Sequence, residues 1–89
     1  MTPARLLLYV TALAGDPAIT ATQIKAALAL VKASAMQNPD SPNRAQDIAY
    51  YCDRITAIIT ALETTSPPHT SANIKEILGD RISVFLREF

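Results

Sequence analysis

The chain has 89 residues, which is the length of one domain, so a catalytic domain joined to a separate binding domain is excluded. Eight Lys and Arg side chains balance eight Asp and Glu side chains, and the formal net charge is zero. A protein that neutralises nucleic-acid phosphates normally shows a basic excess, which this composition lacks. Cys52 is the only cysteine, so no intramolecular disulfide can form, and a reducing cytoplasm fits this composition best.

Proline and glycine divide the chain at residues 15–17, 38–42 and 66–69, which we interpret as three loops. No run alternates apolar and polar residues long enough to predict a strand. The periodicity of the remaining segments predicts helices over about 3–14, 20–37, 42–64 and 71–88. The sequence therefore predicts one all-α domain over residues 1–89.

The first predicted helix has Thr2 as its N-cap, Pro3 at its first position and Gly15 just past its end. Its apolar residues, at 6–10 and 13, surround most of the circumference, which is typical of a buried helix. The same stretch imitates a short signal peptide, but it is too brief to span a bilayer. We expect it to form the first helix, and we expect no membrane partner.

The second predicted helix opens with Thr20 and Gln23, the spacing of a capping box. Apolar residues recur at steps of three and four along one seam: Ala21, Ile24, Leu28, Val31 and Ala35. A second apolar surface lies opposite this seam and consists mostly of small residues that would let another helix approach. We predict that self-association uses this surface together with two residues near the chain end: Ala26, Ala29, Leu30, Ala33, Phe85 and Phe89.

The third predicted helix starts either at Ser41 and Pro42 or at Asn43, which has capping-box spacing to Gln46. Its seam repeats the steps of the second helix: Ile48, Cys52, Ile55, Ile59 and Leu62. Two helices with matching seams and a short proline-bounded turn are expected to pack as an antiparallel hairpin with a small crossing angle.

The fourth predicted helix begins between Thr70 and Asn73, and Asn73 has capping-box spacing to Glu76. Its apolar stripe consists of Ile74, Ile77, Leu78, Ile82, Phe85 and Phe89. Gly79 lies inside this helix, where glycine is unfavourable, so it could mark a kink, a close helix contact or a break. Together the elements predict a compact up-and-down bundle of four helices built on a central hairpin.

Catalytic and metal chemistry lack the residues that they need. His69 is the only histidine, and with Cys52 it cannot supply the closed ligand set of a zinc site from one chain. We interpret His69 as a solvated loop residue and Cys52 as a small buried hydrophobe. A nucleophilic thiol would have to be exposed and paired with a base, which a helix seam prevents. We predict a protein that is not an enzyme and that uses no metal or cofactor.

A face of the third helix suits a protein partner. Tyr50 and Arg54 project away from the seam, and Ala57 and Ala61 complete their face. Tyrosine and arginine are enriched at interface hot spots, and small neighbours leave room for a partner helix. The alternatives are an ordinary surface and a contact with the fourth helix. Nucleic acid is not expected as a partner unless the basic residues of two copies gather: Lys25, Lys32, Arg44 and Arg54.

One family comparison rests on the central loop, residues 38–42 between two helices, and on the ending from Ile74 to Phe89. These features resemble needle-type subunits of type III secretion systems, which are short helical hairpins that polymerise. The break at residues 66–69 departs from that family's uninterrupted C-terminal helix, so we do not assign the chain to it.

Three functional hypotheses follow from these observations. The first is a non-catalytic protein-interaction module in the cytoplasm, a small bacterial or phage regulator, adaptor or antagonist that acts as a homodimer. The second is a self-assembling structural or secretion-type subunit, and the third is a nucleic-acid-associated regulator. The sequence identifies neither the partner nor the oligomeric state, and it leaves open a small ligand between the helices and a fourth helix that swaps into a neighbour.

Overall fold

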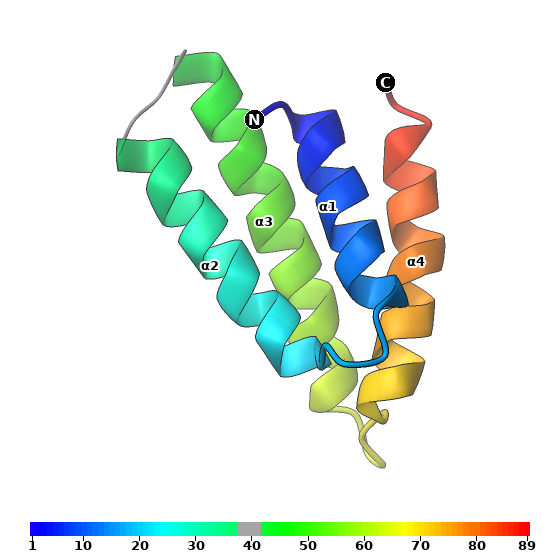
Figure 1. Ribbon diagram of the computed structural model, residues 1–89. Coiled ribbons are helices and arrows are strands. Elements are labelled where there is room, and N and C mark those ends of the chain that lie inside the picture. The colour runs from blue at the N-terminus through cyan, green and yellow to red at the C-terminus, as the bar shows by residue number, and fades with distance from the viewer. Residues whose placement is uncertain (38–41) are drawn as a thin grey trace.

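A computed structural model describes residues 1–37 and 42–89 of the chain. These residues form four helices and no strand: α1 (Pro3–Gly15), α2 (Ala21–Gln37), α3 (Pro42–Glu63) and α4 (Ser71–Leu86) (Figure 1). The all-α class is confirmed, and the predicted helix bounds differ from the observed ones by no more than two residues. The largest difference is at α4, which ends at Leu86 rather than at residue 88.

The predicted N-caps of the first two helices are confirmed. The Thr2 hydroxyl accepts a hydrogen bond from the Arg5 N–H at 3.2 Å, and Pro3 occupies the first turn of α1. Thr20 and Gln23 cap each other: the Gln23 N–H donates to the Thr20 hydroxyl at 3.1 Å, and the Thr20 N–H donates to Gln23 Oε1 at 2.8 Å. Both caps bind backbone N–H groups that would otherwise lack a partner inside the helix.

The last two helices start at the predicted residues, 42 and 71, but one alternative start and one predicted capping box are wrong. Helix α3 begins at Pro42, so Asn43 is inside the helix and is not its cap. Ser41 and the rest of the predicted loop before Pro42 lie outside the described residues. Helix α4 is capped by Thr70, whose hydroxyl accepts from the Asn73 N–H at 3.2 Å. The capping box that we predicted to start at Asn73 is therefore wrong, because Asn73 already belongs to the first turn.

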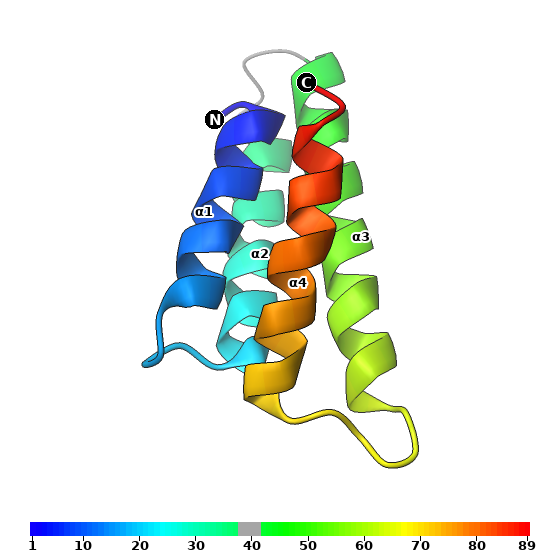
Figure 2. The same cartoon turned by 90° about the vertical axis from the view of Figure 1, so that its right-hand side faces the viewer.

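The helices run alternately up and down (Figures 1 and 2). Helix α2 packs antiparallel to α3, as predicted, and α1 packs antiparallel to α4. These two pairs form the two layers of the bundle, and the N- and C-termini lie at the same end of it (Figure 1). The four-helix bundle is therefore confirmed.

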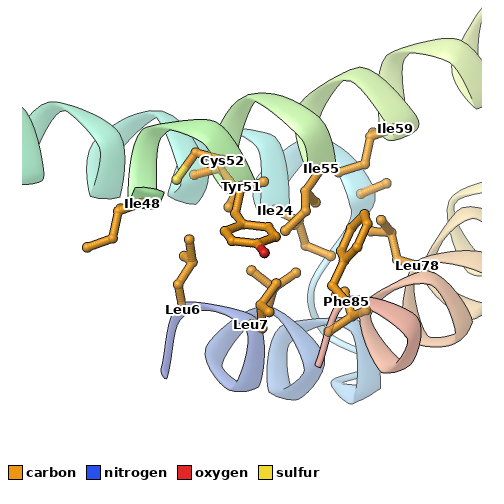
Figure 3. Packing of buried hydrophobic residues seen from close by; sticks show 14 of the residues in the cluster. Leu6, Leu7, Ile24, Ile48, Tyr51, Cys52, Ile55, Ile59, Leu78 and Phe85 are labelled. Carbon is orange, nitrogen blue, oxygen red and sulfur yellow. The ribbon is translucent and has the colours of Figure 1, made fainter. Parts of the chain in front are cut away.

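Each helix contributes apolar side chains to one continuous core (Figure 3). The residues of this core are Leu6, Leu7 and Val10 of α1, Ala21, Ile24 and Leu28 of α2, Ile48, Tyr51, Cys52, Ile55 and Ile59 of α3, and Ile74, Leu78, Ile82 and Phe85 of α4. The outer members of the two predicted seams, Val31, Ala35 and Leu62, are partly buried against it. The seam periodicity therefore identifies the buried faces of α2 and α3 correctly.

Two expectations about helix environments are wrong. Helix α1 is not buried all round, because Leu8 is 57% exposed and Tyr9 is 40% exposed. A helix at the corner of a bundle keeps one face in solvent, and here that face carries apolar residues. Gly79 neither breaks α4 nor marks a close contact, since α4 is continuous and a Cβ at Gly79 would have no neighbouring heavy atom within 4 Å.

Candidate protein-interaction site

Four of the five aromatic side chains gather where α3 meets the end of α4. The ring centroid of Tyr51 lies 5.2 Å from that of Tyr50 in an edge-on arrangement. It also lies 5.8 Å from the rings of both Phe85 and Phe89. These separations fall in the favourable range for aromatic pairs, so Tyr51 links an exposed tyrosine to the end of α4. Figure 3 shows the rings of Tyr51 and Phe85 inside the core. We call Tyr50, Tyr51, Phe85 and Phe89 the aromatic cluster.

Arg54 lies against this cluster and is held by two helices. Its Nη1 donates to the Tyr50 hydroxyl at 2.9 Å, one turn earlier on α3. Its Cζ lies 5.3 Å from the ring centroid of Phe85 on α4 and 5.6 Å from that of Tyr50. Both separations are within reach of a cation–π interaction. The guanidinium is therefore held in place by contacts within its own chain, although it remains exposed to solvent.

Tyr51 supports the cluster from inside. Its side chain is buried, and its hydroxyl donates to Glu88 Oε2 at 2.8 Å. Burial, and then the hydrogen bond to the Glu88 carboxylate, raise the pKa of Tyr51 to about 12. The phenol therefore stays neutral at physiological pH and acts as a structural donor, not as an acid or base.

The four residues predicted to bind a partner lie on one exposed face of α3. Tyr50 is 51% exposed, and Arg54, Ala57 and Ala61 are also exposed. Their spacing of four, three and four places them in one row along the helix. The alternative of a contact with the fourth helix holds in part, because Arg54 packs over Phe85. The same contact leaves Tyr50 and the outer edge of the guanidinium accessible.

The predicted self-association residues divide into two groups. Four of them, Ala26, Ala29, Leu30 and Ala33, are exposed on the outward side of α2, and Leu30 is 74% exposed. Phe89 is also exposed, whereas Phe85 is 7% exposed and packs in the core of its own chain. Because intramolecular packing already covers the Phe85 ring, this residue is withdrawn from the self-association surface.

The sequence analysis missed one member of this α2 surface. Met36 is 57% exposed and lies seven residues after Ala29, so helical spacing places it on the same side. That spacing was a usable signal. We call Ala26, Ala29, Leu30, Ala33 and Met36 the α2 outer face.

Both lysines of α2 turn toward α3. Lys25 Nζ lies 2.5 Å from Glu63 Oε1, and Lys32 Nζ lies 2.7 Å from Asp53 Oδ1. The side chains of both pairs are substantially exposed, so each pair adds little to the free energy of unfolding, but the pairs fix where the charges lie. Each lysine that a nucleic-acid binder would use is occupied by a carboxylate of its own chain.

Cys52 and His69 lie in the environments of structural residues. Cys52 is 1% exposed, as predicted for a buried hydrophobe, and burial, with a smaller effect of Asp53, raises the pKa of its thiol to about 11. His69 lies in the loop before α4, as predicted, but it is only partly exposed to solvent. Its ring Nδ1 lies 2.9 Å from Asn73 Nδ2. The backbone N–H of His69 donates to the Leu62 carbonyl at 3.1 Å.

Residues 1–37 and 42–89 contain neither a candidate metal site nor a candidate membrane span. No group of three or more His, Cys, Asp or Glu side chains there is arranged to hold a metal ion. Among the same residues, no helix combines the length and the apolar character needed to cross a membrane.

Comparison with known proteins finds no protein family, no curated protein and no solved structure that matches the chain. The resemblance to needle-type secretion subunits therefore gains no support from these comparisons.

Proposed function

We propose that this protein acts by binding a partner protein, without catalysis, through the α3 face formed by Tyr50, Arg54, Ala57 and Ala61. In this proposal it is a small cytoplasmic regulator, adaptor or antagonist that works as a homodimer. The observation that carries the proposal is the position of Arg54, held between the Tyr50 hydroxyl and the Phe85 ring while it stays exposed.

Immobilised side chains favour this use. Ordering a long side chain on binding costs free energy, and a side chain that is already ordered avoids most of that cost. Tyr50 rests edge-on against the buried Tyr51, and Arg54 has a partner on each of two helices. A rigid tyrosine and arginine beside small residues have the chemistry of an interface hot spot.

The same contacts indicate the chemistry of the partner. Within the part of the chain that the structure describes, Arg54 forms no ion pair with a carboxylate. A partner carboxylate could bind the outer edge of the guanidinium through charge-assisted hydrogen bonds. The side chains of Ala57 and Ala61 project little from the next two turns of α3, so a partner helix could pack closely along them. We therefore expect the partner to present a helix that carries an acidic residue.

Affinity capture followed by binding measurements with the captured protein tests this proposal. Tyr50→Ala and Arg54→Ala are each expected to weaken binding by about tenfold or more, with unchanged helical content. Arg54→Lys keeps the charge but loses the planar fork, so it should bind with intermediate affinity. Glu76→Ala, an exposed change on α4, is the control and should bind like wild type. Equal binding by all four variants would remove the α3 face from consideration.

A specific observation also favours the second hypothesis, self-assembly. The α2 outer face is apolar and exposed along most of the helix, which is the kind of surface that joins identical subunits. No comparable observation favours nucleic acid, because Lys25 and Lys32 are both paired with carboxylates.

A further inference from the structure

The outward side of α2 differs from every other helix surface in the bundle because it has no charge. The exposed residues of α2 are Thr22, Gln23, Ala26, Ala29, Leu30, Ala33, Ser34, Met36 and Gln37. Each of the other three helices exposes at least one charged side chain: Arg5 on α1, Asp47 on α3 and Glu76 on α4 are examples. The α2 outer face contains no charged residue, and the two lysines that flank it, Lys25 and Lys32, form ion pairs with Glu63 and Asp53 of α3.

We infer that the α2 outer face binds a second copy of this chain, with the two α2 helices antiparallel across a two-fold axis near Leu30. This inference rests on the homodimer of the proposed function and is independent of the α3 face. An isologous contact sets a surface against itself, so a charge near the two-fold axis would meet the same charge of the other copy. A face with no charge meets this requirement.

The shape of the face is also complementary to itself. Leu30 is 74% exposed and projects from a surface whose neighbours, Ala26, Ala29 and Ala33, are small. Residues at positions i, i+3, i+4 and i+7 form the hole that accepts a knob from a facing helix, and 26, 29, 30 and 33 have this spacing. In an antiparallel pair, Leu30 of each copy packs between the alanines of the other. Met36 then lies near the start of the partner's helix, between its Gln23 and its Ala26.

The dimensions set the expected strength of this contact. Helix α2 has 17 residues, which corresponds to a length of about 25 Å. A contact along one helix of this length falls at the low end of specific interfaces, below about 1,200 Å² in total. We therefore expect a dimer that dissociates on dilution, with the antiparallel helix dipoles in a favourable arrangement.

Sedimentation equilibrium over a concentration series, from about micromolar to about millimolar, tests this inference. Wild type should change from monomer to dimer as its concentration rises. Leu30→Glu and Leu30→Lys should each raise the dissociation constant by about 100-fold or more, because each places two like charges at the axis. An equimolar mixture of the two variants should dimerise again, since the two-fold axis then brings opposite charges together. Leu30→Ala, which removes the knob without adding charge, should weaken the dimer to a smaller extent.

The controls separate this contact from other surfaces and from the partner site. Val84→Glu adds a charge at a residue of α4 that is 52% exposed, and it should dimerise like wild type. Tyr50→Ala should also dimerise normally, so loss of partner binding and loss of dimerisation are measured independently. A wild type that remains monomeric throughout, a dimer that Leu30→Glu leaves intact, or a charge-mixed pair that stays monomeric would each overturn the inference.

Discussion

The Tyr51 hydroxyl on α3 donates a hydrogen bond to the Glu88 carboxylate just beyond α4, across 2.8 Å. The phenol ring is packed in the core, while Glu88 is exposed, so this bond crosses from the apolar interior to the surface. A buried hydroxyl without a partner would reduce the free energy of unfolding. Tyr51 therefore joins the two helices twice, through its ring against Phe85 and through its hydroxyl.

Alkaline destabilisation should originate in part at Tyr51. Its pKa is about 12 in the folded protein, against 10.0 for an unperturbed tyrosine, so the unfolded chain loses this proton first as the pH rises. The contribution to stability is full below pH 10 and is lost between about pH 10 and about pH 12. Urea unfolding at a series of pH values, followed by circular dichroism, measures this loss.

Comparison of variants isolates the phenol from the other groups that titrate in this range. Tyr51→Phe keeps the ring but removes the hydrogen bond, so it should lower the free energy of unfolding at neutral pH by about 0.5–1.5 kcal/mol. It should also show a smaller alkaline loss than wild type. Tyr9→Phe on α1 leaves Tyr51 intact and should keep the wild-type pH dependence. An identical alkaline loss in Tyr51→Phe would contradict the assignment.

Gly79→Ala should stabilise the protein. Gly79 lies inside α4, has no positive φ, and leaves open space where a Cβ would be. Alanine there restricts the unfolded chain and favours the helix, so the free energy of unfolding should rise by about 0.4–1 kcal/mol. Gly15→Ala meets the same open space but lies at the last residue of α1, where helix propensity matters less, so it should gain less. A loss of stability in Gly79→Ala, measured by chemical denaturation, would show that α4 needs this glycine.

Features that depend on neighbouring residues in the sequence could be predicted from it. The reciprocal cap of Thr20 and Gln23 uses residues three apart, and the seam that includes Ile55 follows helical periodicity. The row from Tyr50 to Ala61 is also local, so its shared face was predictable. Whether that face is used by a partner is a matter of binding, and it stays a prediction.

Features that depend on how helices meet could not be predicted. The sequence analysis placed Tyr50 and Phe85 in separate patches, whereas Tyr51 joins them into one cluster once α4 packs beside α3. Phe85 was expected on a self-association surface, because periodicity identifies an apolar stripe but not the neighbour that covers it. The pairing of Lys32 with Asp53 likewise requires the hairpin register.

Ile55→Ala should cost about 2–5 kcal/mol of unfolding free energy, because it deletes buried methyl and methylene groups and leaves a cavity. Ile55 is 0% exposed at the centre of the α3 seam. Leu30→Ala, at a residue that is 74% exposed, is the matched control and should change stability by less than about 0.5 kcal/mol. Both are measured by urea denaturation at a concentration where the chain is monomeric. Equal effects of the two changes would contradict the register of the hairpin.

Cys52 should resist thiol reagents in the folded protein. The thiolate is the reactive form, and burial raises the pKa of this thiol to about 11, so little thiolate exists at neutral pH. The sulfur is also inaccessible, since Cys52 is 1% exposed. Modification by a disulfide reagent should therefore be slow in buffer and stoichiometric in denaturant. Ser83→Cys places a second thiol at an exposed position on α4. Under native conditions one thiol per chain of this variant should react rapidly. Rapid native reaction of the wild type would show that the α3 seam opens readily, and it would overturn the assignment of Cys52 as a structural residue.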